Sequence, residues 1–192
     1  QLTGTMPSTI DTYPTYSYTF HDDLSNGLTL IDDAADTEHP IKVMIGDTDV
    51  TSNFTKTTTG LSDGCDLELS CANVKGIDGV TVTADTKVVV TYYAKLNPEN
   101  AVIAGTGNPN TAYLEFSNNP NGTGAGKTPV DKVTVFTYEL VVNKVDGSSA
   151  ETVKPALAGA KFTLFKKNAD NGWDTVKEEG NGTTDTTFTF TG

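Results

Sequence analysis

Short runs in which apolar and polar residues alternate extend along most of the chain. Successive side chains of a β-strand point to opposite faces, so this period of two predicts strands with one buried face. The strongest run is V-T-V-T-A-D-T-K-V-V-V-T-Y-Y-A at 80–94, which predicts one long strand or two. Strands are also predicted at 15–21, 28–31, 40–46, 111–117, 131–145, 161–167 and 185–191, and 65–71 is a strand or hairpin edge. The pattern predicts an all-β fold, with no more helix than one turn at 97–104.

The domain organisation follows from the point at which the strand pattern changes. A loop rich in Asn, Gly and Pro at 118–129 precedes the long run 131–145, which passes from one pattern into the next without a linker. The length leaves room for one large or two small domains. We therefore predict two domains, 1–140 and 141–192.

Charge and composition disfavour a nucleic-acid partner and a membrane span as part of the function of this chain. The chain has 13 lysines, no arginine and 25 acidic residues, which give a net charge of −12. Such a surface repels phosphate backbones, so no nucleic-acid partner is predicted. No apolar run approaches the roughly 20 residues that a membrane helix needs, so no membrane span is predicted.

The two cysteines offer a crosslink or a metal site. Cys65 and Cys71 lie in D-G-C-D-L-E-L-S-C-A-N. Structural zinc takes four ligands, and His21 and His39 are distant in the sequence, so a zinc site is disfavoured. A local Cys65–Cys71 disulfide across a short turn is the preferred prediction, which suits an extracellular protein, and a pair of free thiols is the alternative.

Other catalytic or binding patterns are weak. The acidic run D-D-A-A-D-T-E at 32–38 lacks the spacing of a calcium loop, and no nucleophile pattern supports a hydrolase. No cofactor and no metal are predicted. The aromatic-rich segment from Tyr13 to Tyr18 is either the buried face of a strand or a binding face, and its alternation favours the core.

One lysine lies in an apolar strand pattern. Lys144 belongs to V-V-N-K-V-D-G at 141–147, which is followed by L-A-G-A-K-F-T-L-F at 157–165. Alternation puts Val142 and Lys144 on one face and Val141, Asn143 and Val145 on the other. Lys144 is then either solvated, which the pattern alone favours, or buried, where an unpaired charge is costly.

These two motifs resemble the start of the collagen-adhesin B-type domain of Gram-positive surface proteins and pilins. In that family the lysine at this position is buried and forms an isopeptide bond with an asparagine of the same domain. The resemblance therefore implies that Lys144 is a crosslink donor. It also implies that the glutamate and the acceptor asparagine of this domain lie after Gly192, together with its C-terminal strands.

The first part of the chain resembles the isopeptide-forming fimbrial domain of sortase-assembled pilins. The matching pieces are T-F-H-D-D-L-S-N-G-L-T-L at 19–30, V-T-Y-Y-A-K-L-N at 90–97 and N-A-V-I-A-G-T-G-N-P-N-T-A-Y-L-E-F-S-N-N-P at 100–120. They occur in that order ahead of the B-type start. The resemblance implies tandem immunoglobulin-like β-sandwiches, A-type and then B-type, with segments absent at both ends.

Within the A-type domain the resemblance implies a Lys–Asn isopeptide bond assisted by an aspartate. The aspartate before L-S-N-G-L corresponds to Asp22, with Asp23 beside it. The asparagine of N-T-A corresponds to Asn110, and Asn108 is the second choice. The lysine is expected on a strand before Gln1.

The chemistry explains why these residue types are needed. A neutral lysine amine attacks the asparagine side-chain carbon and ammonia leaves, so burial must lower the lysine pKa and raise that of the neighbouring acid. The fold holds the groups at reacting distance, and the reaction occurs once per molecule without turnover.

The resemblance implies a structural subunit of a cell-wall-anchored, extracellular pilus that a sortase joins to other pilin subunits. The alternative is a wall-anchored adhesin whose domains form a stalk or bind host matrix or glycan.

Overall fold

The computed structural model describes residues 1–180 and 182–191, which fold into two compact units. Unit 1 comprises Gln1–Val102 and Gly107–Val135, and unit 2 comprises Ile103–Thr106 and Phe136–Gly192. The all-β prediction is confirmed. Regular elements of the described residues are strands, apart from the short 3-10 helices η1 (Ile10–Thr12), η2 (Thr51–Asn53) and η3 (Val74–Gly76). Within the described ranges, no helix has the length and apolar character needed to cross a membrane.

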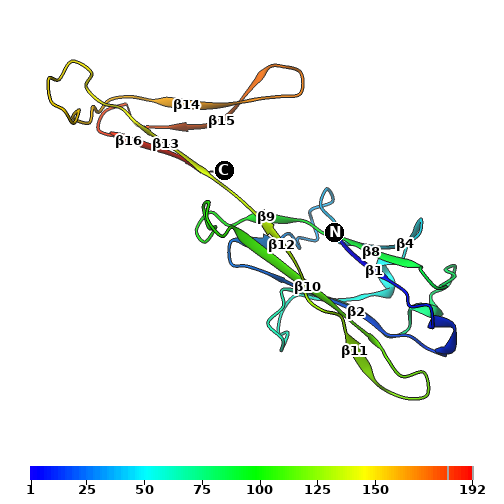
Figure 1. Ribbon diagram of the computed structural model, residues 1–192. Helices are drawn as coiled ribbons and strands as arrows, with labels where there is room; N and C mark the ends of the chain where they lie inside the picture. The colour runs from blue at the N-terminus through cyan, green and yellow to red at the C-terminus, as the bar shows by residue number, and fades with distance from the viewer. Residues whose placement is uncertain (181, 192) are drawn as a thin grey trace. The chain divides into compact units, whose positions relative to one another are not determined.

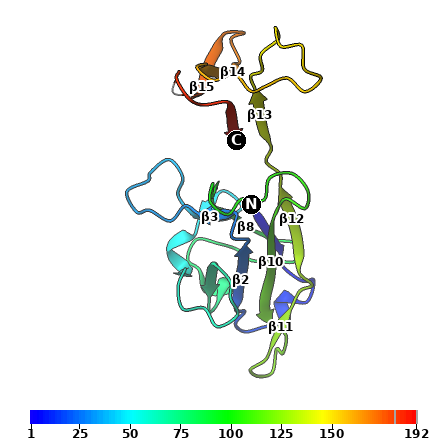
Figure 2. The same cartoon turned by 90° about the vertical axis from the view of Figure 1, so that its left-hand side faces the viewer.

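Unit 1 is built from two antiparallel sheets (Figure 1). The four-stranded sheet has the order β1 (Leu2–Thr5), β8 (Lys87–Thr91), β4 (Lys42–Ile45) and β5 (Thr48–Asp49). The six-stranded sheet has the order β11 (Ala125–Lys127), β10 (Asn108–Ser117), β2 (Tyr18–Leu24), β7 (Leu67–Cys71) and β6 (Thr55–Thr57), and β12 (Asp131–Val135) also pairs with β10. A separate ribbon joins β3 (Leu28–Leu30) and β9 (Ala94–Leu96). Figure 2 shows β2, β10 and β12 side by side.

The core of unit 1 combines residues from the two sheets. The central strands bury alternate residues, namely Tyr18, Phe20, Leu67 and Leu69 in β2 and β7 of the six-stranded sheet and Val43, Ile45, Val88 and Val90 in β4 and β8 of the four-stranded sheet. Burying a side chain of this size stabilises the fold by about 1.5–3 kcal/mol. The strand registers are fixed by this pattern, because a slip of one residue would turn every buried side chain to the opposite face.

The strongest predicted strand is shorter than expected. Within 80–94, β8 begins only at Lys87, because the segment before it forms a turn. In that turn Thr86 N–H donates to the Thr83 carbonyl, and Asp85 has a φ of 65°. A left-handed residue interrupts extended pairing, which period-two alternation alone cannot reveal.

Unit 2 consists of two antiparallel ribbons. β13 (Glu139–Asn143) pairs with β16 (Thr187–Thr191), and β14 (Phe162–Lys167) pairs with β15 (Trp173–Glu179). Phe188 is buried and packs against Phe162, with the ring centroids 4.6 Å apart. Large apolar side chains that remain exposed in this unit include Leu140, Val153, Phe165, Trp173 and Val176.

The division between the units differs from the predicted one. The predicted run 131–145 is split into β12 and β13, and unit 2 begins at Phe136. The predicted boundary after residue 140 therefore falls inside β13. Thr137 accounts for the early start, because it bridges to Ile103 and its carbonyl accepts a hydrogen bond from Ala104 N–H.

Candidate functional site

Asp22 and Asn110 are brought together by neighbouring strands of the six-stranded sheet. β2 and β10 pair antiparallel, with Asp22 opposite Ala112 and Asn110 opposite Leu24. Residues two apart on a strand share a face, so Asp22 lies on the same face as the core residue Phe20. The two residues are thus diagonal neighbours across the strand pair, within side-chain reach.

The two side chains are in direct contact inside unit 1. The Asn110 Nδ2 donates to Asp22 Oδ1 at 3.0 Å and to the Tyr92 hydroxyl at 2.7 Å. Asp22 is fully buried and Asn110 is 8% exposed. Asp22 Oδ2 and Asn110 Oδ1 are buried with no hydrogen-bond partner among the described residues. Two unpaired oxygens in one buried pair are costly, and a further donor at this position would offset part of that cost.

The surroundings of Asp22 favour its protonated form. Burial raises the pKa of Asp22, and hydrogen bonds from Asn110 and Tyr92 offset only part of this effect. Burial also raises the pKa of Tyr92, and the charge of Asp22 adds to that shift. A carboxyl group held in its neutral form can donate a proton or a hydrogen bond at neutral pH.

A cavity of about 370 Å³ adjoins this pair within unit 1. Its lining includes residues 1–5, Tyr92 and Asn110, and residues 131–133 of β12.

Asn108 has a different role from Asn110. Its side chain is completely buried, and its Oδ1 accepts from Val102 N–H at 2.7 Å. Its Nδ2 donates to the carbonyls of Val102 at 3.1 Å and Val135 at 3.3 Å. The Asn108 amide group is thus engaged by backbone groups, which makes it a structural clamp rather than a candidate acceptor.

Lys144 follows β13 directly and is half-buried on the same side as Val142, whereas Val141, Asn143 and Val145 are exposed. This agrees with the predicted alternation. Its backbone carbonyl accepts from Leu157 N–H at 2.8 Å. The acceptor that the resemblance implies for Lys144 was expected after Gly192, outside the described residues, so its crosslink stays a prediction.

The predicted Cys65–Cys71 disulfide is wrong, and both residues are free cysteines. The segment between them is not a turn, because β7 begins at Leu67 and runs extended to Cys71. The four residue steps from Leu67 to Cys71 alone extend about 13 Å, whereas the Cα atoms of a disulfide lie within roughly 7 Å of each other. The alternating letters L-E-L-S-C carried the correct signal for a strand.

The aromatic segment at the start of β2 belongs to the core. Tyr16 and Tyr18 are 2% and 1% exposed, and burial raises the pKa of Tyr16 to about 12. Tyr13 packs edge-on against Tyr16, with the ring centroids 4.9 Å apart. The favoured core prediction is confirmed, and Tyr16 and Tyr18 offer no exposed face to a ligand.

Tyr92 is a site residue that the sequence analysis did not identify. It follows the inward-facing Val88 and Val90 at the same spacing of two, so continued alternation aims it toward the core. The signal was present in V-V-V-T-Y-Y, but the partner of Tyr92 lies on a strand of the other sheet. Only the tertiary fold brings its hydroxyl to Asn110.

Comparisons with known proteins give structural neighbours only. No protein-family model and no curated protein matches the sequence. The major pilin GBS80 of Streptococcus agalactiae, a 35 kDa C-terminal fragment, aligns over all of this chain and 70% of its own length, with a TM-score of 0.61 and 18% identity. The T6 backbone pilin of serotype M6 Streptococcus pyogenes aligns over 91% of this chain and 36% of its own, with a TM-score of 0.54 and 21% identity.

A third neighbour is a variant of BcpA, the major pilin subunit of Bacillus cereus. It aligns over 98% of this chain and 48% of its own length, with a TM-score of 0.53 and 17% identity. Sequence identities this low support a conclusion about the fold alone. The fold of this chain is that of the major and backbone pilins of Gram-positive bacteria.

Proposed function

We propose that this chain is part of a structural subunit of a cell-wall-anchored, extracellular pilus, in which a sortase links it covalently to other pilin subunits. The fold shared with pilins supports assigning the chain to the class of structural pilus subunits. The observation that carries the proposal is the buried contact between Asp22 and Asn110, with one unpaired oxygen on each side chain. We assign Asn110 as the acceptor of an intramolecular Lys–Asn isopeptide bond and Asp22 as its acid.

The contact fits the proton transfers that the reaction needs. A neutral lysine Nζ attacks Cγ of Asn110 while the bond from Cγ to Nδ2 breaks. Asp22 gives its proton to Nδ2, which leaves as ammonia, and accepts one from the attacking amine, so the carboxyl group is regenerated. The hydrogen bond of 3.0 Å already joins the Asp22 carboxyl group to the departing nitrogen. Fixed geometry of this kind replaces an improbable encounter.

The register of β1 indicates where the lysine would lie. Leu2 is opposite Val90, so one further residue pair beyond Gln1 brings the preceding residue opposite Tyr92. That residue shares the face of Leu2 and Gly4 because alternate residues point the same way. In a longer chain, a lysine immediately before Gln1 would therefore point toward the cavity beside Asn110.

Lys144 is the proposed donor of a second crosslink, within unit 2. Its half-buried position next to Val142 supports this assignment. The acceptor asparagine and the assisting glutamate are proposed to lie on strands that follow residue 192.

The test is the intact mass of a protein that extends before Gln1. The wild type is expected to be lighter than its sequence mass by one ammonia for the unit 1 bond. Asp22→Ala and Asn110→Ala are each expected to restore that mass, because one removes the proton shuttle and the other the acceptor.

Asp23→Ala is the matched control. Asp23 is the adjacent carboxylate, but it is exposed and points to the other face, so this variant is expected to keep the mass loss. A wild-type mass equal to the sequence mass, or an unchanged loss in Asp22→Ala, would contradict the assignment.

A further inference from the structure

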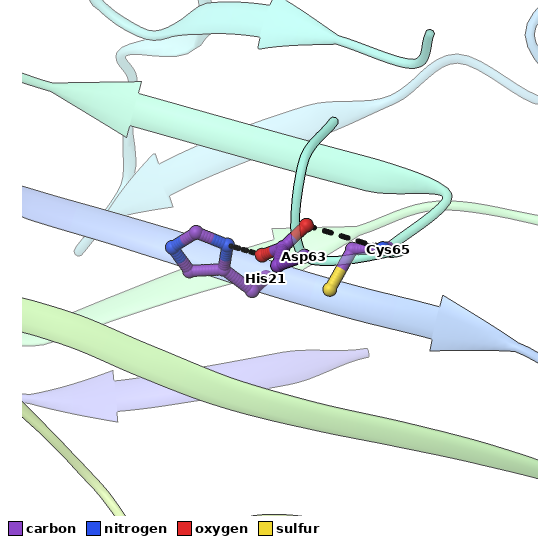
Figure 3. Close-up of side chains that lie close together, drawn as sticks. All are labelled: His21, Asp63 and Cys65. Atoms are coloured by element: carbon purple, nitrogen blue, oxygen red, sulfur yellow. Dashed lines mark hydrogen bonds and ion pairs between the residues drawn. The ribbon is translucent and has the colours of Figure 1, made fainter. Parts of the chain in front are cut away.

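A second cluster of chemically active side chains lies on the outer face of the six-stranded sheet. His21 is adjacent to Asp22 in β2 and therefore points to the opposite face. Asp63 and Cys65 belong to the loop that leads into β7, and this loop passes over the strand so that the three side chains converge (Figure 3). One ligand atom from each of His21, Asp63 and Cys65 lies within 4.8 Å of the others.

The Asp63 carboxylate is the centre of this cluster. Its Oδ2 accepts from His21 Nδ1 at 2.7 Å and from the Tyr113 hydroxyl at 2.8 Å. Its Oδ1 accepts from Cys65 N–H at 3.2 Å. The His21 ring also stacks on Tyr113, with centroids 4.4 Å apart and planes 5° apart. The contacts of Tyr113 and of the Cys65 N–H would remain with a metal bound, and they orient His21 and Asp63 as outer-sphere partners do.

The contacts of His21 show which of its nitrogens faces the cluster. Its side chain is 8% exposed, and Nε2 is buried with no hydrogen-bond partner in the described part of the chain. The ring therefore makes its polar contacts through Nδ1, the atom that faces Asp63. A cation bound at Nδ1 would leave the ring proton on Nε2, so His21 would bind it as a neutral imidazole.

The local charge favours a cation. Glu68 Oε2 lies 3.8 Å from His21 Nδ1, in addition to Asp63. The charges of Asp63 and Asp23 both act on Cys65. The nearby lysine is Lys127, which contacts the Tyr113 hydroxyl at 3.3 Å and is paired with Glu115.

We propose that His21 Nδ1, an Asp63 carboxylate oxygen and Cys65 Sγ form a binding site for a divalent transition metal of the zinc class. One nitrogen, one oxygen and one sulfur ligand suit zinc, and Glu68 or water would take the fourth position. Ligand atoms in a tetrahedral zinc site are roughly 3–4 Å apart. The metal would therefore replace the His21–Asp63 hydrogen bond with little movement of the loop. This site is independent of the proposed crosslink.

A cysteine, a histidine and an aspartate can also form a catalytic nucleophile with its base, but the pKa of the Cys65 thiol disfavours that function. Burial, with the hydrogen bond and charge of Asp63, raises the pKa of Cys65 to about 12. A thiol of this kind is not a ready nucleophile at neutral pH. Metal binding must displace the thiol proton, so metal affinity is expected to increase with pH.

The experiment uses the 192-residue chain, freed of metal with a chelator and titrated with Co²⁺ and then Zn²⁺. The expected result is one Co²⁺ per chain, with a thiolate-to-cobalt charge-transfer absorption band that Zn²⁺ abolishes. Cys65→Ser is expected to remove the band, and His21→Asn to weaken Zn²⁺ binding at least tenfold. Cys65 is partly exposed in a loop, so its variant remains informative if His21→Asn does not fold.

The chain provides matched controls, since it has a second cysteine and a second histidine. Cys71→Ser and His39→Asn are expected to keep both the absorption band and the Zn²⁺ affinity. A wild-type chain without the band, or one whose band survives Cys65→Ser, would overturn the metal site. The cluster would then serve only to anchor its loop to the sheet.

Discussion

Asn110 is held by two acceptors, and Tyr92 is one of them. The Tyr92 hydroxyl lies 2.7 Å from Asn110 Nδ2 and also interacts with Asp22. We infer that it is a positioning residue for the proposed bond. Tyr92→Phe keeps the ring and removes one hydrogen bond of about 1 kcal/mol, so crosslinking is expected to slow roughly five- to tenfold. The measurement is a time course of the ammonia loss by intact mass.

A purely structural role for Tyr92 is tested by measuring stability separately from the rate of crosslinking. In an Asp22→Ala background, which cannot crosslink, Tyr92→Phe is expected to change the free energy of unfolding by no more than that hydrogen bond. Tyr93→Phe is the control, because Tyr93 is 40% exposed and faces the other way. Equal crosslinking rates in wild type and Tyr92→Phe would remove Tyr92 from the site.

Individual residues show how far the sequence could predict this site. Alternation placed Lys144 on the face of Val142, whereas Asp22 was identified through the family resemblance and Tyr92 was not identified. It could not pair His21 with Asp63, because these residues are 42 positions apart and meet only through a loop that folds over β2. Distance in sequence thus did not keep His21, Asp63 and Cys65 apart, and the disulfide prediction failed because β7 is extended.

At the level of elements, the turn between β2 and β3 depends on a glycine in the L-S-N-G-L segment. A Cβ added to Gly27 would lie 1.9 Å from Asn108 Oδ1 and 2.8 Å from Asn108 Cγ. Asn108 cannot move away cheaply, since its amide group holds Val102 and Val135 through three hydrogen bonds. Gly27→Ala is therefore expected to destabilise unit 1 by about 1–3 kcal/mol in urea unfolding.

The comparison for this prediction is Gly122→Ala in the same unit. A Cβ there would meet only the Asn119 amide group, at 3.2 Å, near the end of a flexible side chain. Its stability is expected to stay within about 0.5 kcal/mol of wild type. If the two variants unfold at the same urea concentration, the clamp formed by Asn108 is not rigid.

The strands themselves were predictable to the extent that their signals are local. Residues 161–167 and 185–191 were predicted as strands and correspond to β14 and β16. The turn at Asp85 and the start of unit 2 at Phe136 were missed, since one depends on a single left-handed residue and the other on a bridge between Ile103 and Thr137. The alternation pattern could not predict the order of strands in the sheets, because neighbouring strands in a sheet are often distant in the chain.

On the scale of the whole molecule, the two units differ in how they are stabilised. Unit 1 has a continuous apolar core between sheets, whereas unit 2 leaves Phe165, Trp173 and Val176 more than half exposed. The proposed bond at Lys144 would join the end of β13 to a strand that follows residue 192, so its main consequence is for the stability of unit 2.

We expect Lys144→Ala to destabilise unit 2 strongly in a protein that extends beyond residue 192. A crosslink that closes a loop of several tens of residues contributes about 3–4 kcal/mol by analogy with a disulfide. Its loss is expected to lower the melting temperature of unit 2 by roughly 10–25 °C in calorimetry, and to speed cleavage by proteases that need local opening.

Lys166→Ala is the control, because Lys166 lies exposed on β14 and is expected to leave both measurements unchanged. The wild-type protein is also expected to yield a branched peptide at Lys144 after digestion with trypsin, since an amide-linked lysine is not a cleavage site. Normal cleavage after Lys144, together with equal melting temperatures, would show that unit 2 is stabilised without this bond. In that case Lys144 would act as the half-buried, solvated lysine that strand alternation alone favours.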